Sequence, residues 1–140
     1  MNKEATKITI SSTIDSPVGA VWKKWNDPDD IKNWNNASAD WHTPKAENDL
    51  RKGGRFNYRM EARDGSAGFD FFGTYDNVIQ GELIEYTIGD GRKVKVVFFS
   101  DDGKTKITTT FDAENQNPVE MQKNGWQSIL DNFKKYCENN

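Results

Sequence analysis

Alternating apolar and polar residues predict a β-strand with one wet face near the start of the chain. The segment runs from Lys7 to Ile14 and places Ile8 and Ile10 on the same face. The period of two returns at about Gly53 and continues to about Ala113, interrupted by glycine-containing turn sequences. These later segments predict consecutive antiparallel strands joined by tight turns, which is a meander.

Elsewhere, apolar residues recur at the spacing of amphipathic helices. The pairs Ser16-Pro17 and Asp27-Pro28 each place a capping residue before a proline, which predicts the starts of two short helices. After Pro118 the spacing of apolar residues predicts a longer helix that continues to about Glu138. An antiparallel sheet that is polar on one side must cover its apolar side, and this helix is the only predicted element large enough to do so. Its apolar stripe consists of Met121, Trp126, Ile129, Leu130, Phe133 and Cys137.

Length and composition narrow the class of protein. The 140 residues are expected to form one domain, 1–140, with its core at about 7–137. With 19 Lys and Arg against 22 Asp and Glu, the net charge of -3 lacks the basic field of a nucleic-acid binder, so no nucleic-acid partner is expected. The start has no apolar signal region and no apolar run is long enough to span a membrane, so we expect a soluble, cytoplasmic protein without membrane insertion.

Few residues are candidates for catalysis or metal binding. His42 is the only histidine, and no acid is placed to orient it, which favours a surface or rim position over a general base. The single cysteine, Cys137, excludes an internal disulfide and is more typical of a small buried hydrophobe than of a nucleophile. One histidine and one cysteine form no metal-ligand cluster, and the sparse glycines form no phosphate-binding loop. We predict no catalytic residue, no metal site and no cofactor, although the sequence leaves enzymatic activity open.

Short motifs along the chain resemble, in order, those of the START-like (SRPBCC) superfamily. They are most similar to the branch homologous to the C-terminal domain of the activator of the heat-shock protein 90 ATPase. The resemblance covers the chain from Lys7 to about Tyr136. The motifs are Ser16-Pro17 with Val21-Trp22, Asp27-Pro28 with Ile31 and Trp34, Gly53-Gly54-Arg55-Phe56, Gly73, Leu83 to Thr87, Thr105 to Thr109, and Gly125-Trp126 with Leu130.

This resemblance implies an α+β helix-grip fold, in which a seven-stranded curved antiparallel sheet surrounds a long C-terminal helix and leaves a hydrophobic cavity. Two short helices follow the first strand, and the segment at Trp41 becomes a short second strand. The superfamily includes lipid carriers, hormone receptors, cyclases and chaperone activators, so the fold alone does not settle the activity.

Aromatic side chains are the main candidates for a binding site. They make up 12% of a chain that is only 34% hydrophobic, so these rings must supply the core, the walls of a pocket, or both. Phe71 and Phe72 cannot both point inward on a regular strand, and a bulge would exchange them. The predicted cavity-lining residues are Trp41, Tyr58, Met60, Phe72, Tyr75, Tyr86, Phe98, Trp126 and Leu130.

Three functions follow from these observations. The leading hypothesis is a module that binds a small hydrophobic or amphipathic ligand, such as a lipid, without catalysis. The alternative is a chaperone-associated interaction protein of the stress response, and a cyclase or hydrolase is less favoured because no polar catalytic constellation is found. We expect a monomer or weak dimer, and the sequence does not identify the ligand.

Overall fold

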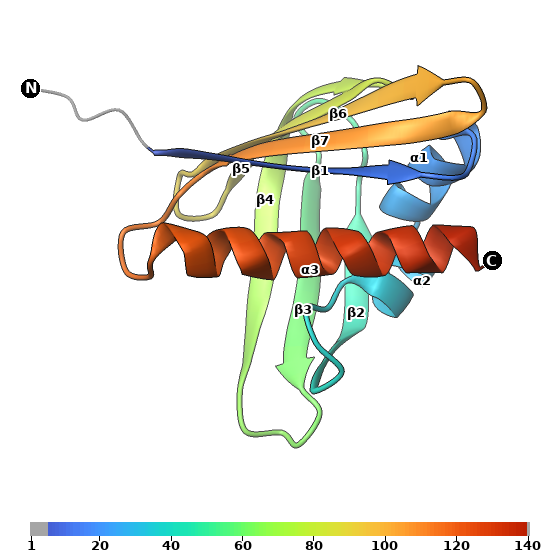
Figure 1. Ribbon diagram of the computed structural model, residues 1–140. Helices are drawn as coiled ribbons and strands as arrows, with labels where there is room; N and C mark the ends of the chain where they lie inside the picture. Colours follow the sequence, from blue (N-terminus) through green and yellow to red (C-terminus); the bar gives the residue numbers. More distant parts are fainter. Residues whose placement is uncertain (1–5, 140) are drawn as a thin grey trace, which may run out of the picture.

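A curved antiparallel sheet and a long helix laid against its concave side form the body of the computed structural model, which describes residues 6–139 (Figure 1). This confirms the predicted α+β helix-grip fold, including the two short helices after the first strand. In chain order the elements are β1 (Lys7–Ile14), α1 (Val18–Asn26), α2 (Pro28–Trp34), β2 (Trp41–Asn48), β3 (Arg55–Ala62), β4 (Gly68–Ile79), β5 (Leu83–Ile88), β6 (Lys93–Asp101), β7 (Lys104–Asp112) and α3 (Val119–Glu138).

The seven strands are arranged in the order β1-β7-β6-β5-β4-β3-β2. From β2 to β7 each strand pairs with the next one along the chain, as expected of a meander, and β1 joins the sheet by pairing with β7. The β6–β7 hairpin turns at Asp102 and Gly103, both of which have positive φ angles, and glycine adopts this backbone conformation without steric cost. The segment at Trp41 is β2, as the resemblance implied.

The two short helices begin differently. At α2, the Asp27 carboxylate accepts a hydrogen bond from the backbone N–H of Asp29 at 2.9 Å, and Pro28 occupies the first turn, as predicted. At α1, the predicted Ser16 cap is wrong, because Pro17 itself is the extended N-cap residue and no side chain caps the helix. The backbone oxygen of Ser16 instead accepts a hydrogen bond from the Thr105 hydroxyl, which ties the helix start to β7.

Helix α3 runs alongside β1 and crosses β3 and β4 (Figure 1). Leu130, Phe133 and Cys137 are buried, as its apolar stripe predicted. Met121 is 60% exposed, contrary to prediction, and the neighbouring Gln122 is buried instead. The Gln122 amide hydrogen-bonds three backbone groups of the loop between β7 and α3, so this loop requires a polar side chain at the helix start.

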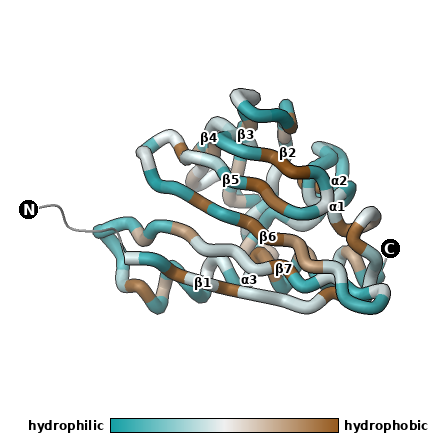
Figure 2. Tube along the Cα trace, turned by 90° about the horizontal axis from the view of Figure 1, so that it is seen from above, coloured by the Kyte–Doolittle hydropathy of each residue, from teal (hydrophilic) through white to brown (hydrophobic). Residues whose placement is uncertain are grey.

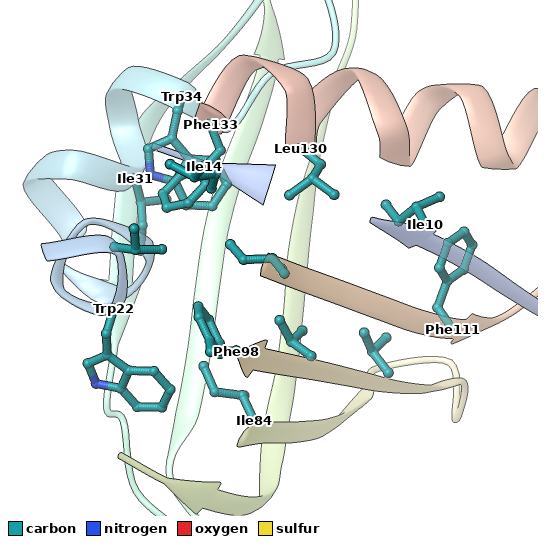
Figure 3. Packing of buried hydrophobic residues seen from close by; sticks show 14 of the residues in the cluster. Ile10, Ile14, Trp22, Ile31, Trp34, Ile84, Phe98, Phe111, Leu130 and Phe133 are labelled. Atoms are coloured by element: carbon teal, nitrogen blue, oxygen red, sulfur yellow. The ribbon is translucent and has the colours of Figure 1, made fainter. Parts of the chain in front are cut away.

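Hydrophobic residues lie within the strands and helices, while hydrophilic residues dominate the turns (Figure 2). The hydrophobic core includes the region where α1 and α2 meet β6 and the C-terminal half of α3 (Figure 3). There the Trp22 ring meets Phe98 edge-on, with 5.0 Å between ring centroids, and Phe133 lies 4.7 Å from Trp34. None of the described helices is long and apolar enough to cross a membrane.

The free edges of the two outer strands, β1 and β2, are partly blocked against pairing with a further strand. Along β1, the side chains of Gln127 and Lys134 from α3 donate hydrogen bonds to the backbone oxygens of Ser11 and Thr13. Along β2, the pairing with β3 shifts register between His42 and Lys45, at the position of a proline that has no backbone N–H to donate.

Candidate functional site: a cavity between the sheet and α3

A cavity of about 340 Å³ lies between the concave face of the sheet and α3. Its volume falls within the range of small-molecule binding sites, which is roughly 300 to 1,000 Å³. Nine of its 19 lining residues are aromatic, contributed by α1, α2, β3, β4, β5 and α3. The aromatic lining residues are Trp25, Trp34, Phe56, Tyr58, Phe69, Phe71, Tyr75, Tyr86 and Trp126, and the aliphatic ones are Ile10, Met60, Ile84, Ile129 and Leu130.

Strand register brings the rings of the sheet together. Tyr58 on β3 lies opposite Phe71 on β4, and Tyr75 on β4 lies opposite Tyr86 on β5. Residues directly opposite on antiparallel strands point to the same face, so four rings line up on the cavity side. From the helix, Trp126 stacks on Phe111 with centroids 3.9 Å apart and meets Phe71 edge-on.

Two of the three tyrosines belong to a hydrogen-bonded chain. The Tyr75 hydroxyl donates to the Asn48 side-chain oxygen at 2.5 Å, and the Asn48 amide donates to the backbone oxygen of Asn26 at 2.8 Å. The Tyr58 hydroxyl hydrogen-bonds that of Tyr75. The chain therefore connects the cavity wall to the last residue of α1.

Burial keeps all three tyrosines protonated. It is the largest influence on each: it raises the pKa of Tyr58 well above its ordinary value, that of Tyr75 to about 12, and that of Tyr86 far above 10. At neutral pH the cavity therefore presents neutral phenols, each of which can donate one hydrogen bond.

Charged groups reach the cavity at the end formed by the β5–β6 turn and the β7–α3 loop. The Arg92 guanidinium forms an ion pair with Asp90, with 2.8 Å between Nε and Oδ2. Burial acts to raise the pKa of the Asp90 carboxyl, but the hydrogen bonds and charge of Arg92 outweigh it and lower the pKa. Glu114 lines the same cavity, so the two charged lining residues have opposite signs. The remaining polar lining residues are Asn35, Thr109 and Gln122.

Six of the nine predicted lining residues surround this cavity, namely Tyr58, Met60, Tyr75, Tyr86, Trp126 and Leu130. The structure places the other three elsewhere. Phe98 is buried against Trp22 and Trp25, so it belongs to the packed core. Trp41 is half-buried with its ring 5.9 Å from that of Phe69, beside the lining rather than within it.

The third residue, Phe72, points away from the cavity and is 50% exposed. It pairs with Asn57 on β3, whereas its neighbour Phe71 pairs with Tyr58. The Phe72 ring covers Gly89, where an added Cβ would lie only 2.3 Å from the ring. The inward ring of this pair is therefore Phe71, which the prediction omitted.

Other lining residues were also missed by the sequence reasoning. Phe56 and Ile10 follow the same alternation as the predicted residues, so that signal was present in the sequence. Trp25 and Trp34 contact each other on α1 and α2, and their helical stripe gave no sign that the cavity extends to them. The loop residues that reach the cavity have no periodic signal at all.

Groups that could perform other chemistry lie away from the cavity lining. His42 lies opposite Glu61 on the adjacent strand. Cys137 is 4% exposed, and burial raises the pKa of its thiol to about 11, so it is a weak nucleophile. Within residues 6–139, no three His, Cys, Asp or Glu side chains gather as a possible metal site. The cavity wall therefore combines apolar rings with phenolic hydroxyls and lacks these reactive groups.

An antiparallel sheet that grips a C-terminal helix around an internal cavity defines a START-like helix-grip domain. The model of the family described as "Activator of Hsp90 ATPase homolog 1-like protein" matches residues 15–138, and the chain belongs to this family.

Solved structures agree with this assignment. The solution structure of an AHSA1-like protein from Aeromonas hydrophila is 49% identical, with a TM-score of 0.91, and the match covers 96% of this chain and 93% of that chain. A solution structure from Cytophaga hutchinsonii is 52% identical, with a TM-score of 0.83 and coverage of 95% and 92%. A crystal structure from Nitrosomonas europaea is 18% identical, with a TM-score of 0.82 and coverage of 95% and 94%, and shows a common fold alone. A comparison with curated proteins finds no match.

Proposed function

We propose that the protein binds a small hydrophobic or amphipathic molecule in the cavity between the sheet and α3, without carrying out a reaction on it. The observation that carries this proposal is the cavity itself, about 340 Å³ of space lined mainly by aromatic and aliphatic side chains. Protein interiors are normally filled to the density of organic crystals, and unfilled apolar space is destabilising. A bound apolar molecule would recover the lost contacts.

The absence of catalysis is part of the proposal. The lining combines neutral phenols with two charged residues of opposite sign, and it includes neither histidine nor cysteine. General acid–base catalysis near neutral pH needs a group whose pKa lies close to the working pH. The three tyrosines are far from that range because burial raises their pKa values.

Thermal-shift measurements test this proposal. We would screen fatty acids, sterol-like compounds and flavonoid-like compounds. A ligand of about 20 heavy atoms with an efficiency near -0.3 kcal/mol per atom would bind with a Kd of some tens of micromolar. At ten times that concentration we expect a rise in Tm of about 3 to 6 °C.

Two matched variants locate the binding. Trp126→Phe changes a lining residue, whereas Trp22→Phe makes the same change in the packed core. Ligand-dependent quenching of tryptophan fluorescence should fall in the first variant, with Trp25 and Trp34 retaining part of it, and should persist in full in the second. If no compound raises the Tm by more than a degree, ligand binding is wrong.

A chaperone-associated role is the second candidate, supported by the description of the family. A specific feature that favours it is the outer face of the sheet, where Ile79, Val97 and Phe99 are exposed by 44%, 36% and 59%. Exposed apolar groups of this kind are typical of protein contacts. This candidate replaces the first if the ligand screen fails.

A further inference from the structure

Tyr86 differs from the other two cavity tyrosines in its hydrogen bonding. Tyr58 and Tyr75 hydrogen-bond each other, and Tyr75 also donates to Asn48. Within residues 6–139, no hydrogen bond is found for the Tyr86 hydroxyl. Because every fully buried side-chain N or O atom of these residues has a partner, this hydroxyl is not enclosed by protein but opens onto the cavity that Tyr86 lines. Its donor is the one phenolic O–H of the cavity wall that the protein leaves unused.

The Tyr86 ring is held in a defined position. It meets the Phe56 ring edge-on at a centroid distance of 4.9 Å and the Tyr75 ring at 6.3 Å. Its strand, β5, is the central strand of the sheet, with three strands on either side. A donor fixed in this way offers one direction for a hydrogen bond, which is the property of a group that selects a ligand.

The Tyr86 hydroxyl lacks a hydrogen-bond acceptor rather than a donor. A phenol oxygen is a weak acceptor because its lone pair is shared with the ring, whereas its O–H is a strong donor that loses its bond to water when buried. Burial and the neighbouring Tyr75 are the influences that raise the pKa of Tyr86, with no cation lowering it. The proton therefore stays on the hydroxyl, available for donation.

The charges around the cavity favour a neutral acceptor over an anionic one. Arg92 already forms an ion pair with Asp90, and the lining carboxylate of Glu114 would repel an anion. Burying a carboxylate without a dedicated partner is costly, whereas a ketone, ester or ether oxygen needs only one donor.

We propose that Tyr86 selects ligands that carry a neutral hydrogen-bond-accepting oxygen on an otherwise apolar body, with the Tyr86 hydroxyl donating to that oxygen. This inference rests on the proposed binding function and names the class of ligand. The apolar body lies against the rings of Phe71 and Trp126, which meet edge-on in the cavity wall.

Three probes of nearly equal shape separate the possibilities. Acetylnaphthalene presents a neutral acceptor, isopropenylnaphthalene replaces its oxygen with a methylene group, and naphthoate presents an anion, all substituted at the same ring position. Affinities are measured by isothermal titration calorimetry, with ligand-observed NMR for the weaker pairs. The variants are Tyr86→Phe, which removes only the hydroxyl, and Tyr136→Phe as a control. Tyr136 donates to Asp30 at the junction of α2 and α3, outside the cavity lining.

In the wild type we expect acetylnaphthalene to bind at least about tenfold more tightly than naphthoate. In Tyr86→Phe the ratio of acetylnaphthalene affinity to isopropenylnaphthalene affinity should fall by about tenfold, as expected for a lost hydrogen bond to a buried donor. The ratio should stay within twofold of the wild-type value in Tyr136→Phe.

The failures are distinguishable. If the hydrocarbon and the ketone both bind but their affinity ratio is unchanged in Tyr86→Phe, the role of Tyr86 is wrong while ligand binding stands. Tightest binding by naphthoate would also overturn the inference, because the charged end of the cavity would then choose the ligand. Absence of binding by all three probes, together with a negative compound screen, would remove the proposed function itself.

Discussion

The concave side of the sheet has two ends that use aromatic residues in opposite ways. At the packed end, neighbouring rings contact one another at centroid distances of 4.7 to 5.7 Å and fill the interior. At the hollow end, rings of β3, β4 and β5 face Trp126 across the cavity. The packed end consists of Trp22, Trp25, Trp34, Phe98 and Phe133, of which Trp25 and Trp34 also line the near side of the cavity. The hollow end consists of Phe56, Tyr58, Phe71, Tyr75, Tyr86 and Trp126.

The number of elements that cover the sheet explains this difference. At the packed end, α1 and α2 supply tryptophans that fill the space between β6 and α3. At the hollow end, α3 is the main cover of the curved sheet, and α1 and α2 reach only its boundary through Trp25 and Trp34 (Figure 1). Residue type differs accordingly, since the phenols lie at the hollow end and tryptophan predominates at the packed end. The same class of side chain therefore makes a core where three helices meet and a cavity wall where α3 is the main cover.

Alanine substitution of one tryptophan at each end should have the largest effects on the free energy of unfolding, and these should differ between the two ends. Trp22 is 9% exposed, so Trp22→Ala should lower the free energy of unfolding by about 3 to 5 kcal/mol. Trp126 is half-buried and already faces the cavity, so Trp126→Ala should lower it by about 2 kcal/mol while abolishing ligand binding. Urea denaturation measures both values. A loss below about 1 kcal/mol for Trp22→Ala would show that the packed end is not a core.

Replacing one isoleucine at each end with a larger residue should change the free energy of unfolding by a smaller amount. The sign of the change should differ between the two ends. Ile31 is fully buried at the packed end, so Ile31→Phe should overpack and lower the free energy of unfolding by about 1 to 3 kcal/mol. Ile129 lines the cavity, so Ile129→Phe should be neutral or stabilising by up to about 1 kcal/mol because the new ring fills empty space. The same variant should weaken ligand binding at least about tenfold. Equal destabilisation by both changes would contradict the distinction.

Alkaline pH should act on the hollow end through its buried phenols, whereas the tryptophans of the packed end do not titrate. Burial raises the pKa of Tyr86, so its contribution to stability is fully present below its unfolded pKa, about 10, and is lost as the pH rises toward its folded pKa. One such group adds at most about 1.4 kcal/mol of lost stability per pH unit. Urea denaturation from pH 8 upward should show a shallower decline in Tyr86→Phe than in the wild type. Trp126→Phe, which removes no titrating group, should match the wild-type slope.

Periodicity predicted the part of the site that lies on regular strands. Tyr58 and Met60 follow from alternation along β3, and Tyr86 follows from alternation along β5. The same reasoning failed on β4. Phe72 and Tyr75 could both point inward only if a bulge lay between them. The register shift instead lies after Tyr75, so Phe71 and Tyr75 share the inner face. The position of a bulge depends on pairing with a neighbouring strand, which one segment of sequence does not contain.

The sequence also does not show whether an inward-facing residue lies beside the cavity or in the packed core. Phe98 does point inward, but it lies beneath α1, where the tryptophans fill the space. Periodicity gives the face of a residue and not its distance from a helix elsewhere in the chain. Arg92 and Glu114 reach the cavity from a turn and a loop, and their positions depend on how those segments fold back.

The treatment of the sheet edges bears on how the protein behaves in concentrated solution. An uncovered outer strand is a template on which a second molecule can add its own strand, and this is a common first step toward aggregation. Here Gln127 and Lys134 occupy backbone acceptors of β1, while Pro44 and a register shift interrupt β2. The large apolar side chains of the domain mostly face its interior. Neither edge strand offers an uninterrupted row of free backbone hydrogen-bonding groups with which a second molecule could pair.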